Sequence, residues 1–187
     1  MSTTASLSNH FLIAMPTLDD PNFHHTTTYI CEHNEDGALG VVINRPLEMQ
    51  LGDILEHMNI HPASDGIAAQ QVYMGGPVQS DRGFVLHEPS GDWEATLQVT
   101  ETIGITSSRD ILAAIAEGKG PDHAIVTLGY AGWGAGQLEE ELAANAWLSG
   151  PASSTVVFET PSEERWMAAA ALLGIDLNLL SGDAGHA

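Results

Sequence analysis

Short hydrophobic runs separated by turn-forming residues dominate the first half of the chain, and this pattern predicts strands. The run 10–15 ends at Pro16, and a stretch of β-branched and aromatic residues follows at 26–32. The turn 34–37 contains an Asp-Gly pair, which predicts a hairpin with its return strand at 38–44. Further strands are expected at 71–74, 83–87, 95–99 and 124–128, at 103–106 as a marginal case, and at 155–158 as the last.

Apolar residues recur at helical spacing in other segments. In 51–58 they would share one helix face, and Ser107 or Ser108 can cap a second helix that stops at Gly118. Two more helices are expected after the glycine-rich stretch 129–136 and from about 161 to 173. The strands come in runs instead of alternating strictly with helices. This order favours an α+β fold, with a mixed, mainly antiparallel sheet and helices packed outside it, over a doubly wound parallel fold.

The glycine-rich stretch lies between the apolar segment 124–128 and a helix. Its glycines surround two large aromatic side chains, Tyr130 and Trp133. Glycine is used where φ is positive or where another group approaches closely, so we expect a tightly specified backbone corner here. There is no internal repeat and no shift in composition. We therefore expect one domain over residues 10–187, preceded by a mobile tail at 1–9.

The charge balance excludes several kinds of partner. The chain has 25 acidic and five basic residues, for a formal net charge of -20. Such a field repels nucleic acids and anionic membrane surfaces, because binding to either depends on Lys and Arg. No apolar run reaches the roughly 18 residues that a membrane span needs, and no basic residue precedes an apolar core at the N-terminus. With Cys31 as the single cysteine, a reducing cytoplasm is the expected location.

Long sequence blocks spread along the chain carry a further indication. They are FLIAMP at 11–16, YICEH at 29–33, GALGVVINRP at 37–46, YMGGPV at 73–78, DRGFVLH at 81–87, TSSRDIL at 106–112, LGYAGWGAGQLEEEL at 128–142, the pair Arg165-Trp166, LGID at 173–176 and GHA at 185–187. Together they resemble the AlgH/YqgE family of bacterial proteins from about residue 10 onward. The segment 24–28 is more polar than the resemblance leads us to expect.

The resemblance implies a fold but no reaction and no cofactor. It implies an α+β protein whose bifurcated sheet partly closes into a small barrel, with helices around it. The family name links these proteins to transcriptional control of alginate production, a role that does not require contact with DNA. Given the net charge of -20, we expect any regulation to act through proteins or small molecules.

Cys31 and His33 invite interpretation as a nucleophile and its base. On a strand their side chains would share a face but lie roughly 6.5–7 Å apart. A working pair needs about 2.6–3.2 Å between the reacting atoms. The acidic neighbours Glu32 and Glu35 also disfavour a thiolate. A buried structural cysteine is the better interpretation.

Neither the histidines nor the glycines form a complete binding motif. The nine histidines show no HxxxH or HExxH spacing, so no metal site is predicted unless folding brings His10, His33, His87 and His186 together. The glycine-rich stretch could cradle a phosphate, but it lacks the GxGxxG pattern and a following Lys. The acidic first turn of the next helix, 139–141, would repel a nucleotide. A structural role is therefore preferred.

The arginines are scarce cations in this acidic chain. The plain interpretation is that they tie loops together by pairing with residues such as Asp81, Glu140 or Glu141. The alternative is a cleft for an anionic ligand near the glycine-rich corner 129–137. The residues expected to line that cleft are Asn44, Arg45, Gly75, Gly76, Arg82, His87, Trp133 and Gln137.

Two functions follow from these observations. The first is a non-enzymatic regulatory or interaction protein that binds a protein partner; Trp133, Trp147 and Trp166 could anchor it, although we expect them in the core. The second is a binder of an anionic small molecule, or an enzyme, with its site in the cleft just described. No catalytic residue, metal or cofactor is assigned, and the oligomeric state is left open. The second function requires a closed pocket holding His87 or Arg45, the first an exposed apolar patch.

Overall fold

The structure is a computed structural model that describes residues 6–180. Its strands are β1 (His10–Ala14), β2 (Thr27–Asn34), β3 (Gly37–Val42), β4 (Pro46–Gln50), β5 (Gln71–Met74), β6 (Val78–Glu88), β7 (Thr96–Gln98), β8 (Gly104–Thr106), β9 (His123–Gly134) and β10 (Trp147–Pro151). Its helices are α1 (Leu51–His57), α2 (Asp65–Ala68), α3 (Arg109–Ala116), α4 (Gln137–Ala143), the π-helix η1 (Thr155–Glu159), the 3₁₀-helix η2 (Ser162–Glu164), α5 (Arg165–Ala171) and α6 (Leu177–Leu180). None of the helices within residues 6–180 has the length and apolar character needed to cross a membrane.

The chain divides into two compact units. Unit 1 comprises the residues up to 44 and those from 131 onward, and unit 2 comprises residues 45–130. The expectation of one domain over 10–187 stays a prediction. Part of the predicted tail 1–9 lies outside the described residues, and the rest belongs to unit 1. There the Leu7 amide donates to Nδ1 of His33 at 2.9 Å, and the Tyr29 hydroxyl donates to the Asn9 side chain at 2.7 Å.

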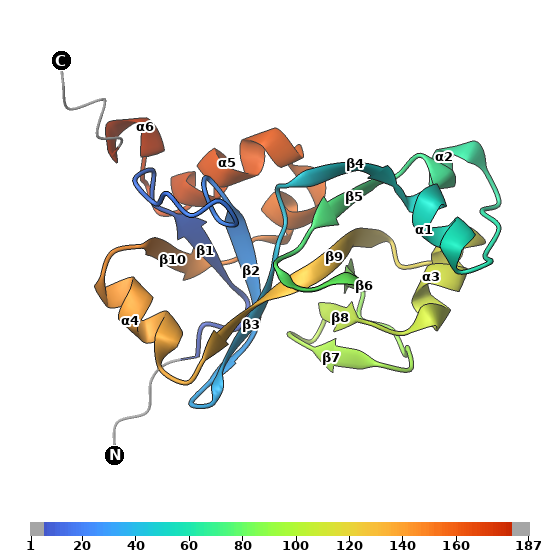
Figure 1. The fold of residues 1–187 in the computed structure, drawn as a ribbon, viewed down its shortest axis with the longest axis horizontal. Coiled ribbons are helices and arrows are strands. Elements are labelled where there is room, and N and C mark those ends of the chain that lie inside the picture. Colours follow the sequence, from blue (N-terminus) through green and yellow to red (C-terminus); the bar gives the residue numbers. More distant parts are fainter. Residues whose placement is uncertain (1–5, 181–187) are drawn as a thin grey trace. The chain divides into compact units, whose positions relative to one another are not determined.

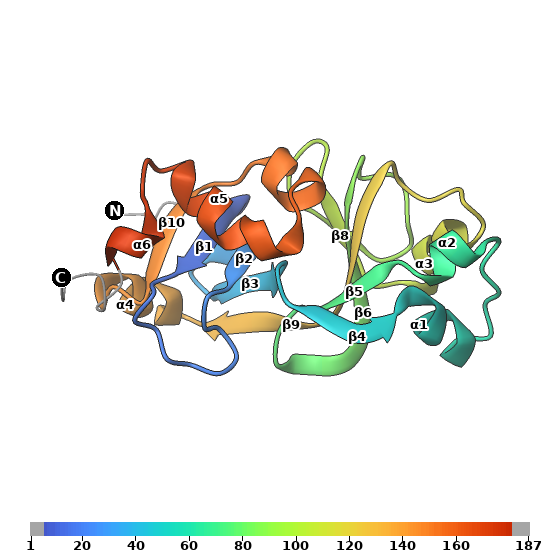
Figure 2. The ribbon, with the colours of Figure 1, turned by 90° about the horizontal axis from the view of Figure 1, so that it is seen from above.

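Unit 1 is built on a wholly antiparallel sheet in the order β10-β1-β2-β3-β9. Helix α5 packs on β1 and β2, and α4 packs on β3 and β10 (Figures 1 and 2). The predicted hairpin is present, because β2 and β3 pair down to Asn34 and Gly37 around the Asp36-Gly37 turn. Apolar side chains from β1, β2, β9, α4 and β10 form one core cluster: Leu12, Ala14, Ile30, Ala131, Trp133, Leu138 and Trp147.

Unit 2 has a mixed sheet in the order β4-β5-β9-β6-β8-β7. Only the pair β5–β9 is parallel, and the chain between these two strands contains β6–β8 and α3 (Figure 1). Val72 of β5 and Val126 of β9 lie opposite each other and are both buried, as the mainly apolar run at 124–128 predicts. Helices α1 and α3 contribute Leu51, Leu55, Ile111 and Ile115 to the same core.

The predicted fold class is confirmed. The protein is α+β, with a mainly antiparallel mixed sheet and helices outside it. The sheet is bifurcated because β9 is a member of both sheets: its residues up to 130 pair with β5 and β6, and those from 131 pair with β3. Each sheet has free edges among the described strands. This agrees with a curled sheet that forms a half-barrel and does not close into a complete one.

The predicted backbone corner at 129–136 is wrong for most of its length. The glycine-rich stretch continues β9 as far as Gly134, and the turn into α4 comes only at Gly136, which has φ 76°. Glycine is still required for close approach. A Cβ on Gly129 (φ 78°) would overlap the Gly76 carbonyl oxygen and lie 3.0 Å from the Val78 carbonyl oxygen. Gly129 therefore allows a neighbouring backbone segment to approach β9 closely, and it does not end the strand.

The last predicted strand, 155–158, is also wrong. This segment is the π-helix η1, in which the Val157 amide donates to the Ser153 carbonyl at 3.1 Å. A short apolar run fits a buried helix as well as a strand, and β-branched residues alone do not decide between them. The last described strand is β10, which pairs with β1, and neither it nor β4 was predicted. Helix α2, which is capped by Ser64, was not predicted either.

Candidate functional site

The eight residues predicted to line an anion cleft are divided between the two units. Unit 1 contains Asn44, Trp133 and Gln137, and unit 2 contains Arg45, Gly75, Gly76, Arg82 and His87. Most of them have an identifiable structural task. Whether any of them binds a ligand stays a prediction, and the structure only shows where each one lies.

The unit 1 residues are engaged in hydrogen bonds. The Asn44 side chain accepts from the Thr27 amide at 2.9 Å and donates to the His25 carbonyl at 3.0 Å. The Gln137 side chain accepts from the Gly134 amide at 3.0 Å, which fixes the start of α4 on the end of β9. Asn44 and Gln137 thus close loops within unit 1.

Glu141 of α4 gathers the aromatic residues of unit 1. One of its carboxylate oxygens accepts from the indoles of Trp133 and Trp147, at 3.1 and 2.9 Å, and the other accepts from Gln137 at 2.9 Å. Phe23 packs on both indoles, with ring centroids 6.2 and 5.3 Å away. The expectation that Trp133 and Trp147 are core residues is confirmed, and Trp166 is half-buried with its indole donating to Ala14.

Gly75, Gly76 and Arg45 of unit 2 take part in contacts between backbone segments. Gly75 and Gly76 are buried, and a Cβ on Gly75 would overlap the Gly129 carbonyl oxygen. The Arg45 carbonyl accepts from the Met74 amide at 2.8 Å, next to the pairing of β4 with β5. This segment therefore brings two backbones together at a distance that only glycine allows.

His87 is a buried link in a chain of polar groups. Its Nδ1 lies 3.0 Å from the Pro89 carbonyl, and its Nε2 lies 2.7 Å from the Thr106 hydroxyl, which is 2.7 Å from the Thr96 hydroxyl. A carbonyl only accepts, so Nδ1 carries the proton and Nε2 accepts from Thr106. Desolvation by burial lowers the pKa of His87, although the Pro89 hydrogen bond opposes that shift. His87 is thus a neutral, satisfied core residue.

This pKa shift predicts a pH dependence of stability. Between the lowered pKa of folded His87 and its ordinary value of 6.5, the unfolded chain binds a proton that the folded chain does not. Stability from His87 is therefore complete above about pH 6.5 and is lost as the pH falls. In His87→Gln, the slope of unfolding free energy against pH below 6.5 should drop by up to about 1.4 kcal/mol per pH unit. Urea denaturation from about pH 5 to 7.5 measures it.

The prediction for His87→Gln concerns the slope of the unfolding free energy against pH and not its absolute value. The substitution also removes buried hydrogen bonds, so it lowers stability at every pH. His25, whose pKa is lowered by desolvation and by the charge of His24, retains part of the slope in the variant. A slope equal to that of the unchanged protein would contradict the assignment of His87 as buried and neutral.

The expectation that the arginines pair with acidic residues is wrong for two of them. Arg82 donates to the Ser107 hydroxyl at 3.2 Å and lies 5.8 Å from the centroid of the Phe84 ring, and Arg109 donates to the Met58 carbonyl at 2.6 Å. Within residues 6–180 neither guanidinium contacts a carboxylate. Arg165, in contrast, is buried and donates to the carbonyls of Ile43 and Thr160.

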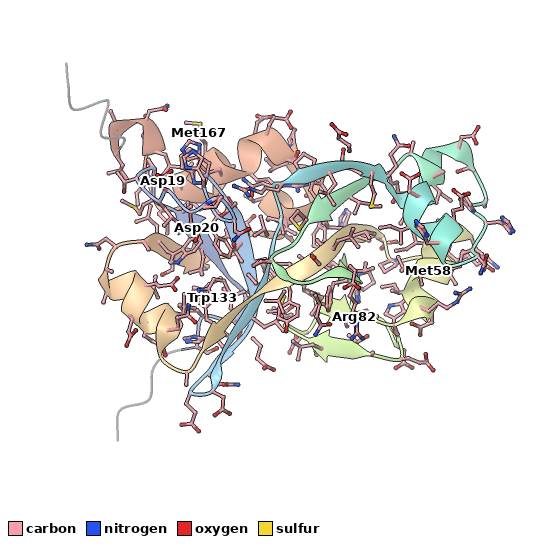
Figure 3. All side chains as sticks on the ribbon, in the orientation of Figure 1. Asp19, Asp20, Met58, Arg82, Trp133 and Met167 are labelled. Atoms are coloured by element: carbon pink, nitrogen blue, oxygen red, sulfur yellow. The ribbon has the colours of Figure 1, made fainter. Side chains whose placement is uncertain are left out.

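Arg82 and Arg109 both line a pocket in unit 2. The pocket has a volume of about 480 Å³ and is formed by β4, the C-terminal end of α1, β6, the first turn of α3 and β9. Its lining residues are Met49, Ile54, His57, Met58, Asp81, Arg82, Gly83, Ser107, Ser108, Arg109, Leu112 and Leu128. Figure 3 labels two of them, Met58, which directly follows α1, and Arg82 of β6.

The pocket is apolar inside and charged at its mouth. Ile54 and Leu112 are buried members of the unit 2 core, whereas Arg82 and Arg109 are exposed. Two of the chain's five basic residues thus lie at one pocket, against a single lining carboxylate, Asp81. The volume and lining are typical of small-molecule sites.

Sequence reasoning identified only Arg82 of this pocket. Arg109 was recognised as a scarce cation and the 51–58 helix was predicted, but nothing in their spacing joined them to residue 82. One pattern could have indicated that these arginines share a site. Arg82 and Arg109 each lie in a short polar segment that is followed directly by apolar core residues. The small-molecule hypothesis requires a closed pocket holding His87 or Arg45, and neither residue lines this pocket.

The chemistry considered for cysteine and histidine has a structural explanation. Cys31 is buried, and desolvation, followed by the charge of Glu32, raises the pKa of its thiol. His33 uses Nδ1 to hold the Leu7 amide, and its Nε2 lies 3.4 Å from Glu139. Within residues 6–180 no three His, Cys, Asp or Glu side chains are grouped to hold a metal ion, and His186 lies outside the described residues.

Comparisons with known proteins extend over the whole chain. A family model described as AlgH-like matches residues 11–178. A UPF0301 protein of Nitrosococcus oceani is 58% identical over 187 residues, and one of Thioalkalivibrio sulfidiphilus is 57% identical over 188 residues; both alignments cover 100% of each chain. The solution structure of the AlgH protein from Pseudomonas aeruginosa is 50% identical, with a TM-score of 0.81 over 100% of this chain and 99% of that one. A crystal structure from Corynebacterium diphtheriae is similar in fold alone, at 18% identity and a TM-score of 0.73, covering 97% and 94% of the two chains.

Proposed function

Because the chain belongs to the AlgH-like family, we propose that it is a regulatory binding protein whose unit 2 pocket holds a small molecule for recognition by a protein partner. The observation that carries the proposal is the pocket of about 480 Å³. It combines an apolar interior with a few polar groups at its mouth, as ligand sites do. The regulatory part of the proposal rests on the link between this family's name and transcriptional control.

The polar lining supports binding more than catalysis. The Ser107 hydroxyl accepts from Arg82, and the Ser108 hydroxyl donates to Asp110 at 2.5 Å. Asp110 is desolvated, which raises its pKa, but hydrogen bonds from Ser108 and from the Glu94 and Ile111 amides outweigh this and lower it. A carboxylate with a lowered pKa is a poor general base for activating a serine. Ser108 and Asp110 instead fix the start of α3.

A protein partner is supported by a separate observation in unit 1. The large hydrophobic side chains that are exposed within residues 6–180 all lie in the last part of the chain: Met167, Leu172, Leu179 and Leu180. Exposed apolar groups on C-terminal helices are suited to protein contact. The net charge of -20 makes nucleic acid an unsuitable partner.

Filling the pocket from within provides the test. Gly83 lines it, and an added Cβ there would meet only Leu112 Cδ1, at 3.9 Å, so a side chain fits the backbone and extends toward the pocket. In a thermal-shift screen of acidic, neutral and basic metabolites, a ligand at about 100 times its Kd should raise the melting temperature by roughly 5–10 °C. Gly83→Val should remove this shift.

The matched control is Lys119→Gln, an exposed change in unit 2 away from the pocket lining, which should keep the shift. A screen without any stabilising compound would count against the proposed function. A compound that stabilises Gly83→Val as much as the unchanged protein would place binding outside this pocket, with the same consequence.

A further inference from the structure

We infer that the ligand of the unit 2 pocket is an amphipathic anion, with one oxyanion head group and an apolar body. This inference rests on the proposed function and specifies the chemistry of the same site. Its first support is the small number of hydrogen bonds that the two arginine side chains at the pocket make. Each guanidinium has several N–H donors in a planar fork, yet Arg82 and Arg109 each make one hydrogen bond, to a neutral oxygen, within residues 6–180.

The absence of carboxylate partners is informative because carboxylates are abundant in this chain. With 25 acidic residues and five basic ones, an arginine has many potential partners, and pairing would be the ordinary outcome. Arg82 and Arg109 are instead held at a pocket mouth by Ser107 and by the Met58 carbonyl. A guanidinium held in this way can form two parallel hydrogen bonds to a carboxylate or phosphate.

The interior of the pocket specifies the rest of the ligand. The apolar part of its wall consists of Met49, Met58 and Leu128, which are half-buried, and of Ile54 and Leu112, which are buried. These side chains offer no hydrogen bonds to a sugar or a base. The two methionines are unbranched and adapt to chains of different shape. An alkyl or aryl body is therefore favoured over a nucleotide.

Local charge has to overcome the field of the whole molecule. The net charge of -20 repels any anion at long range, and Asp81 does so within the lining. The first turn of α3 at Ser108 and Arg109 adds the positive end of a helix dipole, which Asp110 partly offsets. A head group with a single negative charge suits this balance better than a polyanion.

The inference is tested with four ten-carbon probes of equal chain length, each below its micelle concentration: decanoate, decyl phosphate, decanol and decylammonium. Calorimetric titration should show decanoate or decyl phosphate binding about 10-fold or more tightly than decanol, as charge-assisted hydrogen bonds provide. Octanoate should bind about 15-fold more weakly than decanoate, because each buried methylene contributes about fourfold. The ratio of decanoate to decyl phosphate distinguishes a carboxylate head group from a phosphate one.

Variants with opposite expected effects locate the head group. Arg82→Gln and Arg109→Gln should each weaken decanoate binding about 10-fold and leave decanol binding unchanged. Asp81→Asn should strengthen decanoate binding about threefold, because it removes a like charge from the lining. Lys119→Gln makes the same charge change as the arginine variants but lies outside the lining, and should have no effect.

The outcomes separate this inference from the proposed function. Decanol or decylammonium binding as tightly as decanoate, or arginine variants that behave like Lys119→Gln, would overturn the anionic ligand while leaving a small-molecule pocket in place. Decanoate binding that depends on the arginines but is no tighter than octanoate binding would overturn the apolar body. If no probe and no screened compound binds, the proposed function fails together with the inference.

Discussion

Gly129→Ala should destabilise the protein by about 3–5 kcal/mol, a large part of the free energy of unfolding of a typical domain. Gly129 has φ 78°, a conformation that costs a residue with a Cβ about 1–2 kcal/mol. The new methyl group would also overlap the Gly76 carbonyl oxygen and lie 3.0 Å from Ser80 Cα. These atoms belong to the backbone and cannot move aside without breaking the pairing of β6 with β9.

Two other glycines of the same stretch provide matched controls. Gly136 has φ 76° but open space around its Cβ position, so Gly136→Ala should cost only the conformational term, about 1–2 kcal/mol. Gly134 has neither constraint, and its nearest contact is the Gln137 side chain at 3.9 Å, so Gly134→Ala should stay within about 0.5 kcal/mol. Urea denaturation gives the three values. Equal losses at all three positions would contradict the assignment of close backbone approach to Gly129.

Arg165→Ala should cost about 3–5 kcal/mol through loss of buried hydrogen bonds and the cavity left behind. Arg165 is 5% exposed at the start of α5. Its guanidinium donates to the Thr160 carbonyl at 2.9 Å and to the carbonyl of Ile43, which lies 122 positions away and directly follows β3. Without the guanidinium, the buried carbonyl of Ile43 loses this hydrogen-bond donor, and α5 loses a link to the sheet of unit 1.

Equilibrium denaturation of Arg165→Ala, Arg165→Lys and Arg109→Gln checks this prediction. Lysine keeps the charge but not the planar fork, so it should restore part of the lost stability. Arg109 is exposed and its substitution should cost less than about 1 kcal/mol. A loss at Arg165→Ala no larger than at Arg109→Gln would show that the guanidinium does not hold α5 in place.

The residue types of the candidate site could be read from the sequence, but the contacts of these residues could not. The scarcity of basic residues in a chain of charge -20 drew attention to the arginines. Their partners could not be predicted. Arg82 contacts a serine hydroxyl and Arg109 a backbone carbonyl; every residue has such a carbonyl, and many positions have a Ser or Thr hydroxyl. His87 was predicted to line the same cleft as Arg82, yet it is buried among Pro89, Thr106 and Thr96.

The sequence by itself determined the features that depend on neighbouring residues. The hairpin at Asp36-Gly37, the amphipathic helices α1 and α3 and the buried strand at 124–128 follow from local patterns, and the long blocks identified the family and its α+β fold. Tertiary structure decided the rest. It extended β9 through its glycines, made a π-helix that contains the apolar run 155–158, and brought residues from the segments 49–58, 81–83 and 107–112, together with Leu128, to one pocket. Strand partners and pocket walls depend on contacts between distant segments, and the residues that make these contacts show no periodicity along the chain.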